Sequence, residues 1–162
     1  MKNVLIVYYS RNGHTETAVT KLSEILGADV EKIVDLKNRT GVWGFITGGR
    51  DANLKKLTTI QPVKYNPKDY EVVILATPTW ASAATPAART YIQQQKGGLN
   101  KVAFLVSQGG TCNGKIYKDL EELIGKSPIA TVDFSRKDLQ GTEWTEKLKT
   151  FAESVKKSKD AS

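Results

Sequence analysis

The chain has 162 residues, enough for one domain with a hydrophobic core of its own. Its composition, 40% hydrophobic and 25% charged, is typical of a globular protein in water, and no apolar run approaches the roughly 18 residues that suggest a membrane span. The formal net charge is +7, which alone does not choose among nucleic acid, an anionic membrane surface and an acidic protein as partner. Because the lysines are not interleaved with aromatic residues, we expect a solvated basic surface and no nucleic-acid binding.

Cys112 is the only cysteine, which excludes an intramolecular disulfide and a multi-cysteine metal site. A single thiol also suits a reducing compartment, and we expect the cytoplasm. The apolar run that follows Lys2 is too short for a signal peptide and lacks a small-residue cleavage site. We expect Cys112 to be inert, with a redox-active thiol as the alternative.

The chain begins with a strand, a polar turn and a helix. Residues 4–9 are apolar, and their β-branched and aromatic side chains are typical of a strand buried on both faces. The turn at residues 10–15 follows, and an amphipathic segment at residues 16–26 comes directly after it. The N-terminus of the expected helix therefore lies beside the turn.

Polar groups of this turn converge on the helix N-terminus. The hydroxyls of Ser10 and Thr15, the amide of Asn12 and the free N–H groups of the first helical turn could all donate hydrogen bonds to one phosphate. The same residues can also be ordinary helix caps that bind nothing. The turn lacks the G-x-x-x-x-G-K-[ST] and G-x-G-x-x-G patterns, a cysteine nucleophile and a strand-end aspartate, so it is equipped to hold a phosphate and not to cleave one.

Two less regular stretches follow. Residues 28–34 alternate like an edge strand, with Val30 and Ile33 among the apolar positions. Residues 35–53 are expected to be irregular, because four glycines break any period. Large apolar side chains within the insertion at residues 41–53 would then cover the core or serve a function.

Further along the chain, buried strands alternate with helices. The strands are expected at residues 71–76, 102–106 and 129–134. Polar loops at residues 77–84 and 107–114 follow the first two, and the last amphipathic helix covers residues 142–155. This alternation predicts an α/β fold, a three-layer αβα sandwich around a five-stranded parallel sheet. We expect one domain at residues 1–156 and a fraying polar tail at residues 157–162.

The loops at the strand ends resemble those of the flavodoxin family, and the resemblance spans nearly the whole chain. The turn Ser10-Arg11-Asn12-Gly13-His14-Thr15 resembles that family's S/T-x-T/N-G-x-T loop for the FMN phosphate. Thr77-Pro78-Thr79-Trp80 is similar to a flavin-edge loop, Ser107-Gln108-Gly109-Gly110 to a third flavin loop, and Gly49-Arg50-Asp51-Ala52 to a segment of short flavodoxin-like proteins. The resemblance implies strand order 2-1-3-4-5 with FMN where the order reverses, an arrangement for which flavodoxin is itself the standard example.

The resemblance also implies the cofactor, FMN, and the residues that bind it. These are Ser10, Arg11, Asn12, Gly13, His14 and Thr15 at the phosphate, Pro78, Thr79, Trp80, Ala81, Ser82 and Ala83 beside the ring, and Ser107, Gln108, Gly109 and Gly110 along its polar edge. Trp80 would stack on or flank the ring, unless it packs on the neighbouring helix. Arg11 can point to solvent, since neutral donors suffice for the phosphate. No catalytic or metal-binding residue is assigned, and His14 is not expected to be an acid-base catalyst.

Functionally, the resemblance implies an electron carrier that shuttles electrons between redox-partner proteins, as a monomer or weak dimer. The alternative is a flavodoxin-like NAD(P)H-dependent oxidoreductase that reduces a quinone or similar acceptor, although no nicotinamide fingerprint is visible. A third hypothesis, a flavin-free module that binds an anionic surface through its lysines, leaves the three loops unexplained.

The chain departs from the family in two respects. Many flavodoxins carry an acidic rim around the flavin, whereas this chain is basic, so we expect partners with acidic docking surfaces. The loop at residues 79–83 contains no glycine, so a peptide flip beside the flavin would force another residue to positive φ at a cost of about 1–2 kcal/mol. We therefore expect the half-reduced flavin to be less stabilised than in flavodoxins with a glycine there.

Overall fold

The computed structural model describes residues 2–110 and 114–160, so Cys112 and the predictions about its thiol lie outside the described residues. The strands are β1 Lys2–Tyr8, β2 Asp29–Lys32, β3 Tyr70–Trp80, β4 Ala83–Ala84, β5 Lys101–Gln108 and β6 Thr131–Ser135. The helices are α1 His14–Leu26, α2 Gly41–Asn53, α3 Pro86–Gln95, α4 Lys115–Ile124 and α5 Glu143–Asp160, with short 3-10 turns at Pro67–Asp69, Lys96–Gly98 and Asp138–Gln140. None of the described helices is long and apolar enough to cross a membrane.

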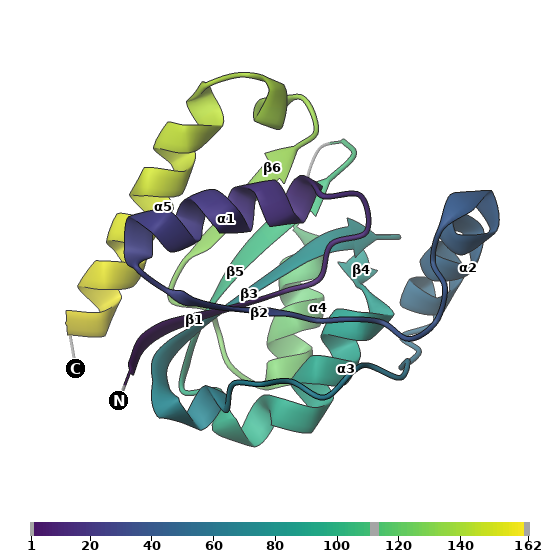
Figure 1. Ribbon diagram of the computed structural model, residues 1–162, viewed down its shortest axis with the longest axis horizontal. Helices are drawn as coiled ribbons and strands as arrows, with labels where there is room; N and C mark the ends of the chain where they lie inside the picture. Colours follow the sequence, from purple (N-terminus) through teal and green to yellow (C-terminus); the bar gives the residue numbers. More distant parts are fainter. Residues whose placement is uncertain (1, 111–113, 161–162) are drawn as a thin grey trace.

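The long strands form one parallel sheet in the order β2-β1-β3-β5-β6 (Figure 1). The two-residue strand β4 pairs antiparallel with β3 and lies off this path. With β4 set aside, the order is the predicted 2-1-3-4-5, and the prediction is confirmed. The order reverses beside β1, which pairs with β2 on one side and β3 on the other.

Helices cover both faces of the sheet, as a three-layer sandwich requires (Figure 1). Side chains of α1 and α5 pack with one set of strand residues, which includes Ile6 and Ile74, and those of α3 and α4 pack with the alternate set, which includes Leu5 and Val73. Successive strand side chains point to opposite faces, so a strand between two helical layers must be apolar throughout. This is why the unbroken apolar run of β1 is buried along its length.

Strand β2 is an edge strand as predicted, but its faces are not those that the alternation suggested. Val30 is 36% exposed, whereas Glu31 is buried. The Glu31 carboxylate accepts hydrogen bonds from the backbone N–H groups of Lys64 and Tyr65, at 2.7 and 3.0 Å. These bonds offset the cost of burying a charged group, which the apolar and polar pattern alone could not reveal.

The prediction of an irregular stretch at residues 35–53 is wrong for its second half, which is the helix α2. Two of its glycines are sites of close packing. A Cβ on Gly44 would lie 2.2 Å from backbone atoms of Arg39, and a Cβ on Gly48 would lie 2.7 Å from the Trp80 ring. The glycines therefore let α2 approach its neighbours, and they do not mark a loop.

The C-terminal helix is also longer than predicted. Helix α5 runs to Asp160, and so into residues 157–162, where the sequence suggested a fraying polar tail. The apolar side chains that anchor it, among them Leu148, Phe151 and Val155, are buried at helical spacing, as the sequence predicted.

Candidate functional site

A cleft of about 500 Å³ opens at the carboxyl ends of β1, β3 and β5. Predicted site residues that line it are Ser10, Arg11, Asn12, His14, Thr15, Pro78, Thr79, Trp80, Ser107, Gln108 and Gly109. Predicted residues that do not line it are Gly13, Ala81, Ser82, Ala83 and Gly110. The remaining lining residues, which were not predicted from the sequence, are Gly41, Val42, Phe45 and Arg136. Three loops that are far apart in sequence thus meet around one hollow, at the edge where parallel sheets bind ligands.

The loop after β1 is shaped by a left-handed glycine at the start of α1. Gly13 has φ 85°, and its N–H donates to Oγ of Ser10 at 3.1 Å. The helix begins at His14, so the N–H groups of its first turn have no partner within the helix. Gly13 therefore contributes its backbone conformation, whereas the side chains of Ser10 and Asn12 line the cleft.

Two buried hydroxyls join this loop to the loop after β5. Oγ1 of Thr15 and Oγ of Ser107 lie 2.7 Å apart, and both residues are less than 5% exposed. Either oxygen can be the donor. One of the two hydroxyl protons is used in this bond, so only one remains for a ligand in the cleft.

The loop after β3 is a hairpin and not the open loop that the sequence suggested. β3 continues to Trp80, and after a two-residue turn β4 pairs back, with Thr79 opposite Ala84. The turn residues Ala81 and Ser82 have φ values of 49° and 61°. Positive φ at both positions is the pattern of a type I′ turn, which normally favours Asn and Gly. Non-glycine residues therefore already hold positive φ at this turn, and the expectation about the half-reduced flavin stays a prediction.

The sequence left open whether Trp80 lies beside the ligand or packs on a neighbouring helix, and the structure shows that it lines the cleft and also packs on a helix. Its ring lines the cleft, and it also packs edge-on against Tyr9 at a centroid distance of 5.7 Å and an interplanar angle of 83°. The ring also lies against Gly48 of α2. These contacts fix the orientation of the indole beside the cleft.

At the start of the loop after β5, the side chain of Gln108 is hydrogen-bonded to the neighbouring strand β6. Its Nε2 donates to Oδ2 of Asp133 on β6 at 3.1 Å. Gly109 and Gly110 are exposed, and a Cβ on either would meet nothing within 4 Å. Open space therefore remains next to the main chain of this loop, so a ligand could approach it.

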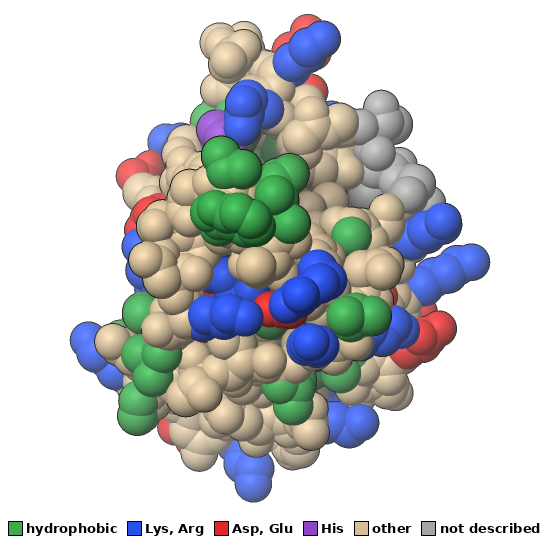
Figure 2. Space-filling model, turned by 90° about the vertical axis from the view of Figure 1, so that its right-hand side faces the viewer, with side chains coloured by type: hydrophobic (Ala, Val, Ile, Leu, Met, Phe, Trp, Pro, Cys, Tyr) green, Lys and Arg blue, Asp and Glu red, His purple; other side chains and the backbone are tan. Residues whose placement is uncertain are grey.

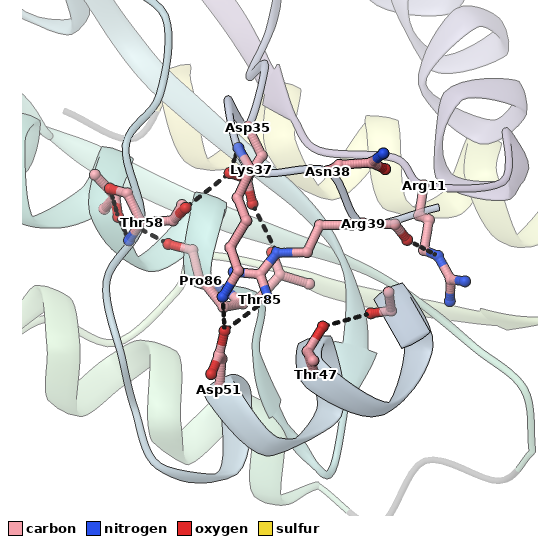
Figure 3. Close-up of polar contacts among 12 residues, drawn as sticks. Arg11, Asp35, Lys37, Asn38, Arg39, Thr47, Asp51, Thr58, Thr85 and Pro86 are labelled. Carbon is pink, nitrogen blue, oxygen red and sulfur yellow. Dashed lines mark hydrogen bonds and ion pairs between the residues drawn. The ribbon is translucent and has the colours of Figure 1, made fainter. Parts of the chain in front are cut away.

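Arg11 does not point freely to solvent, and that expectation is wrong. Its guanidinium donates to the carbonyl oxygens of Arg39 and Gly41, each at 2.8 Å, and lies 5.5 Å from the centre of the Phe45 ring (Figure 3 shows the bond to Arg39). Arg11 thus ties the loop after β1 to the start of α2. This tie places Gly41, Val42 and Phe45 on the wall of the cleft.

A buried ionic network holds the other side of α2 (Figure 3). Nη1 of Arg39 lies 2.7 Å from Oδ2 of Asp51, and Nε of Arg39 lies 3.2 Å from Oδ2 of Asp35. Nζ of Lys37 also lies 3.0 Å from Oδ2 of Asp51. Burial alone would raise the pKa of Asp51, but the hydrogen bonds from Arg39 and Lys37 outweigh it and lower that pKa to about 2. The network therefore works as a set of paired charges that fixes α2 beside the sheet.

One polar atom of the cleft wall lacks a partner. Oγ1 of Thr79 is buried and has no hydrogen bond to any of the described residues. Buried hydroxyls are normally paired, because an unpaired one costs about 1–3 kcal/mol. A ligand with polar groups in the cleft would supply the missing partner, and this fits the polar ring system that the sequence resemblance implies.

Solved structures share this architecture. A flavoprotein from Lactobacillus acidophilus in complex with FMN superposes with a TM-score of 0.71 at 18% identity, covering 86% of this chain and 97% of that one. Flavodoxin 1 from Bacillus cereus superposes with a TM-score of 0.58 at 14% identity, covering 96% of this chain and 98% of that one. Rubredoxin oxygen:oxidoreductase from Desulfovibrio gigas superposes with a TM-score of 0.62 at 19% identity, covering 99% of this chain and 37% of that longer one. No protein-family model and no curated protein matches the sequence.

Proposed function

We propose that this chain, which has the flavodoxin-like fold, binds FMN in the cleft and carries electrons between redox-partner proteins. The observation that carries the proposal is the meeting of three loops from the ends of β1, β3 and β5 around one hollow. One side of that hollow is a helix N-terminus and the other an indole, which suits a ligand with an anion at one end and a flat ring at the other.

The phosphate end of FMN would lie against the loop after β1. Ser10 and Asn12 line the cleft there, and the unpaired N–H groups at the start of α1 favour a negative charge. Arg136, just after β6, lines the same cleft and adds a positive charge that flavodoxin-like loops do not require. This end would anchor the cofactor and take no part in electron transfer.

The ring end would lie beside Trp80. Thr79 has a buried hydroxyl without a partner among the described residues, and Gln108 and Gly109 line the cleft, where a Cβ on Gly109 would meet nothing within 4 Å. FMN, when bound, supplies the redox chemistry, since it accepts and releases electrons one or two at a time. The chain's own residues would orient the ring and exclude water from one of its faces.

A comparison of FMN with riboflavin tests the proposal at the phosphate end. The two ligands differ only in the phosphate, so the wild-type protein should bind FMN much more tightly. Asn12→Ala should weaken FMN binding at least tenfold and leave riboflavin binding unchanged, because a hydrogen bond to a charged group contributes about 1.5–3 kcal/mol. Thr20→Val, on the same helix and away from the cleft, is the matched control. Equal affinities for the two ligands would contradict the proposal.

The redox partners would carry acidic docking surfaces, because Arg11 and Arg136 line the cleft and the chain has a net charge of +7. Electron transfer to an acidic redox protein should then slow as salt is added, since screening weakens the attraction. Acceleration by salt would argue for basic partners.

A second candidate, an NAD(P)H-dependent oxidoreductase, is favoured by one observation. Val42 and Phe45 of α2 add an apolar wall to the cleft, which could cover a flat acceptor such as a quinone. Mixing the FMN-loaded protein with NADH or NADPH, without a reductase, separates the two functions. A carrier stays oxidised, whereas an oxidoreductase is bleached at once.

A further inference from the structure

Helix α2 turns its largest apolar side chains to solvent. Its apolar face consists of Val42, Trp43, Phe45 and Ile46, which are 74, 77, 66 and 52% exposed. The opposite face rests on the body of the protein, where the buried residues are Gly44, Gly48, Asp51 and Ala52. Contiguous apolar surface of this kind marks an interaction site on a folded protein. Figure 2 shows hydrophobic side chains gathered on this end of the molecule.

Positive charges border the apolar face on one side. Lys37, Arg50 and Lys56 surround the single carboxylate of Asp51, and their side chains are 49, 61 and 52% exposed. Arg50 and Lys56 lie 3.6 and 4.0 Å from that carboxylate, which Arg39 and Lys37 already neutralise at closer range. The charges of Arg50 and Lys56 are therefore available to an anionic partner.

Further positive charges lie on the cleft side of the same face. The guanidinium of Arg11 stands over the ring of Phe45, and Arg136 lines the cleft together with Phe45. In Figure 2, lysine and arginine side chains accordingly lie on two sides of the hydrophobic cluster. Pairing with a second copy of the chain would bring these like charges together, which is unfavourable, whereas an anionic surface matches them.

We propose that the apolar face of α2 docks on an anionic phospholipid membrane, with its aromatic side chains at the level of the headgroups. A Trp and a Phe on one side of a helix bordered by Lys and Arg suit such an interface. The helix also stands out from the sheet and its covering helices, so its side chains can reach a flat surface first (Figure 1). Docking would bring the mouth of the cleft, where Val42 and Phe45 lie, to the membrane surface.

Co-sedimentation of the full chain with vesicles tests the proposal. Vesicles of phosphatidylcholine are compared with vesicles that also contain phosphatidylglycerol, at low and high salt. We expect binding to the anionic vesicles only, and weaker binding as salt is added. Trp43→Ser/Phe45→Ser should lower the partition coefficient at least tenfold, because both side chains are exposed and their loss leaves the fold intact. Val34→Ser, at an exposed apolar position outside α2, should change nothing.

Two double variants of equal net charge test whether the positive charges beside α2 contribute to membrane binding. Arg50→Gln/Lys56→Gln should weaken binding about fivefold for each charge removed. Lys147→Gln/Lys149→Gln removes the same charge from α5 and should have little effect, which separates a local site from general attraction by a basic protein. Circular dichroism and thermal unfolding check that each variant is folded.

A third measurement reports how deeply the Trp43 side chain enters the membrane. Brominated lipids should quench tryptophan emission of the wild-type protein, and Trp43→Phe should strongly reduce the quenching while it keeps the binding. The proposal is overturned if no vesicle binds, if both charge variants weaken binding equally, or if the serine variants change only the oligomeric state. Co-sedimentation needs no flavin signal, so its failure would leave the proposed function untouched.

Discussion

Oγ1 of Thr15 and Oγ of Ser107 are 2.7 Å apart in the interior and join loops that are 92 residues apart in the chain. Ser107→Ala would leave the Thr15 hydroxyl buried without this partner, so we expect a loss of about 1–3 kcal/mol in the free energy of unfolding. Denaturant unfolding of the protein without cofactor measures it.

Removing both hydroxyls should be less harmful than the sum of the single changes. In Thr15→Val/Ser107→Ala neither oxygen is left unpaired, so a double-mutant cycle should show a coupling energy. Thr17→Val, whose exposed hydroxyl bonds to the carbonyl of Gly13, is the control and should stay within about 0.5 kcal/mol of wild type. Strict additivity would show that the pair does not act as a unit.

Alanine substitutions at two adjacent glycines of α2 should change the stability of the protein in opposite directions. At Gly48 a Cβ would lie 2.7 Å from Cζ3 of Trp80, so Gly48→Ala should cost about 1–3 kcal/mol and weaken FMN binding by moving the indole. At Gly49 a Cβ would meet nothing within 4 Å, and Gly49→Ala should stabilise the helix by up to about 1 kcal/mol. Thermal unfolding and FMN titration measure both variants. Equal effects would mean that Trp80 does not rest on α2.

Asp51 should make the stability of the protein depend on pH in the acid range. Its pKa falls from an ordinary 3.8 to about 2 on folding, so its contribution is complete above pH 3.8 and is lost as the pH falls through 2. Asp51→Asn should cost about 2 kcal/mol at neutral pH. The difference between wild type and variant should shrink between pH 4 and pH 2 in urea unfolding. A difference that stays constant over this range would contradict the pairing.

The hairpin turn should gain stability from glycine. Ala81 and Ser82 hold φ values of 49° and 61°, which cost a non-glycine residue about 1–2 kcal/mol. Part of that is offset by the greater freedom of glycine in the unfolded chain, so Ala81→Gly and Ser82→Gly should each stabilise by about 0.5–1 kcal/mol. Ala83→Gly, in strand β4, should destabilise. Loss of stability in both turn variants would show that the turn has another conformation in solution.

The sheet was predictable because its signal is local. A run such as residues 4–9, apolar at every position, leaves little choice but a strand covered on both faces, and the polar residues that follow each such run mark the edge where the cleft lies. The sequence therefore located the loops after β1, β3 and β5, and the comparison with solved structures confirms the flavodoxin-like fold.

The missed parts depend on contacts between distant residues. Helix α2 was overlooked because its glycines suggest a loop, although Gly44 and Gly48 stand four apart, the spacing that places both on one helix face. The pairing of Arg39 with Asp51 could not be inferred, since nothing local marks either as buried. Arg136 could have been found, because it directly follows the last strand at the same edge of the sheet.

Whether the cleft holds FMN is decided by the absorbance spectrum of the purified protein, followed by chromatography of the flavin released on denaturation. We expect a yellow protein, or a colourless one that becomes yellow on addition of FMN, with about one FMN released per chain. A protein that stays colourless with excess FMN, or that releases a different flavin, would contradict it.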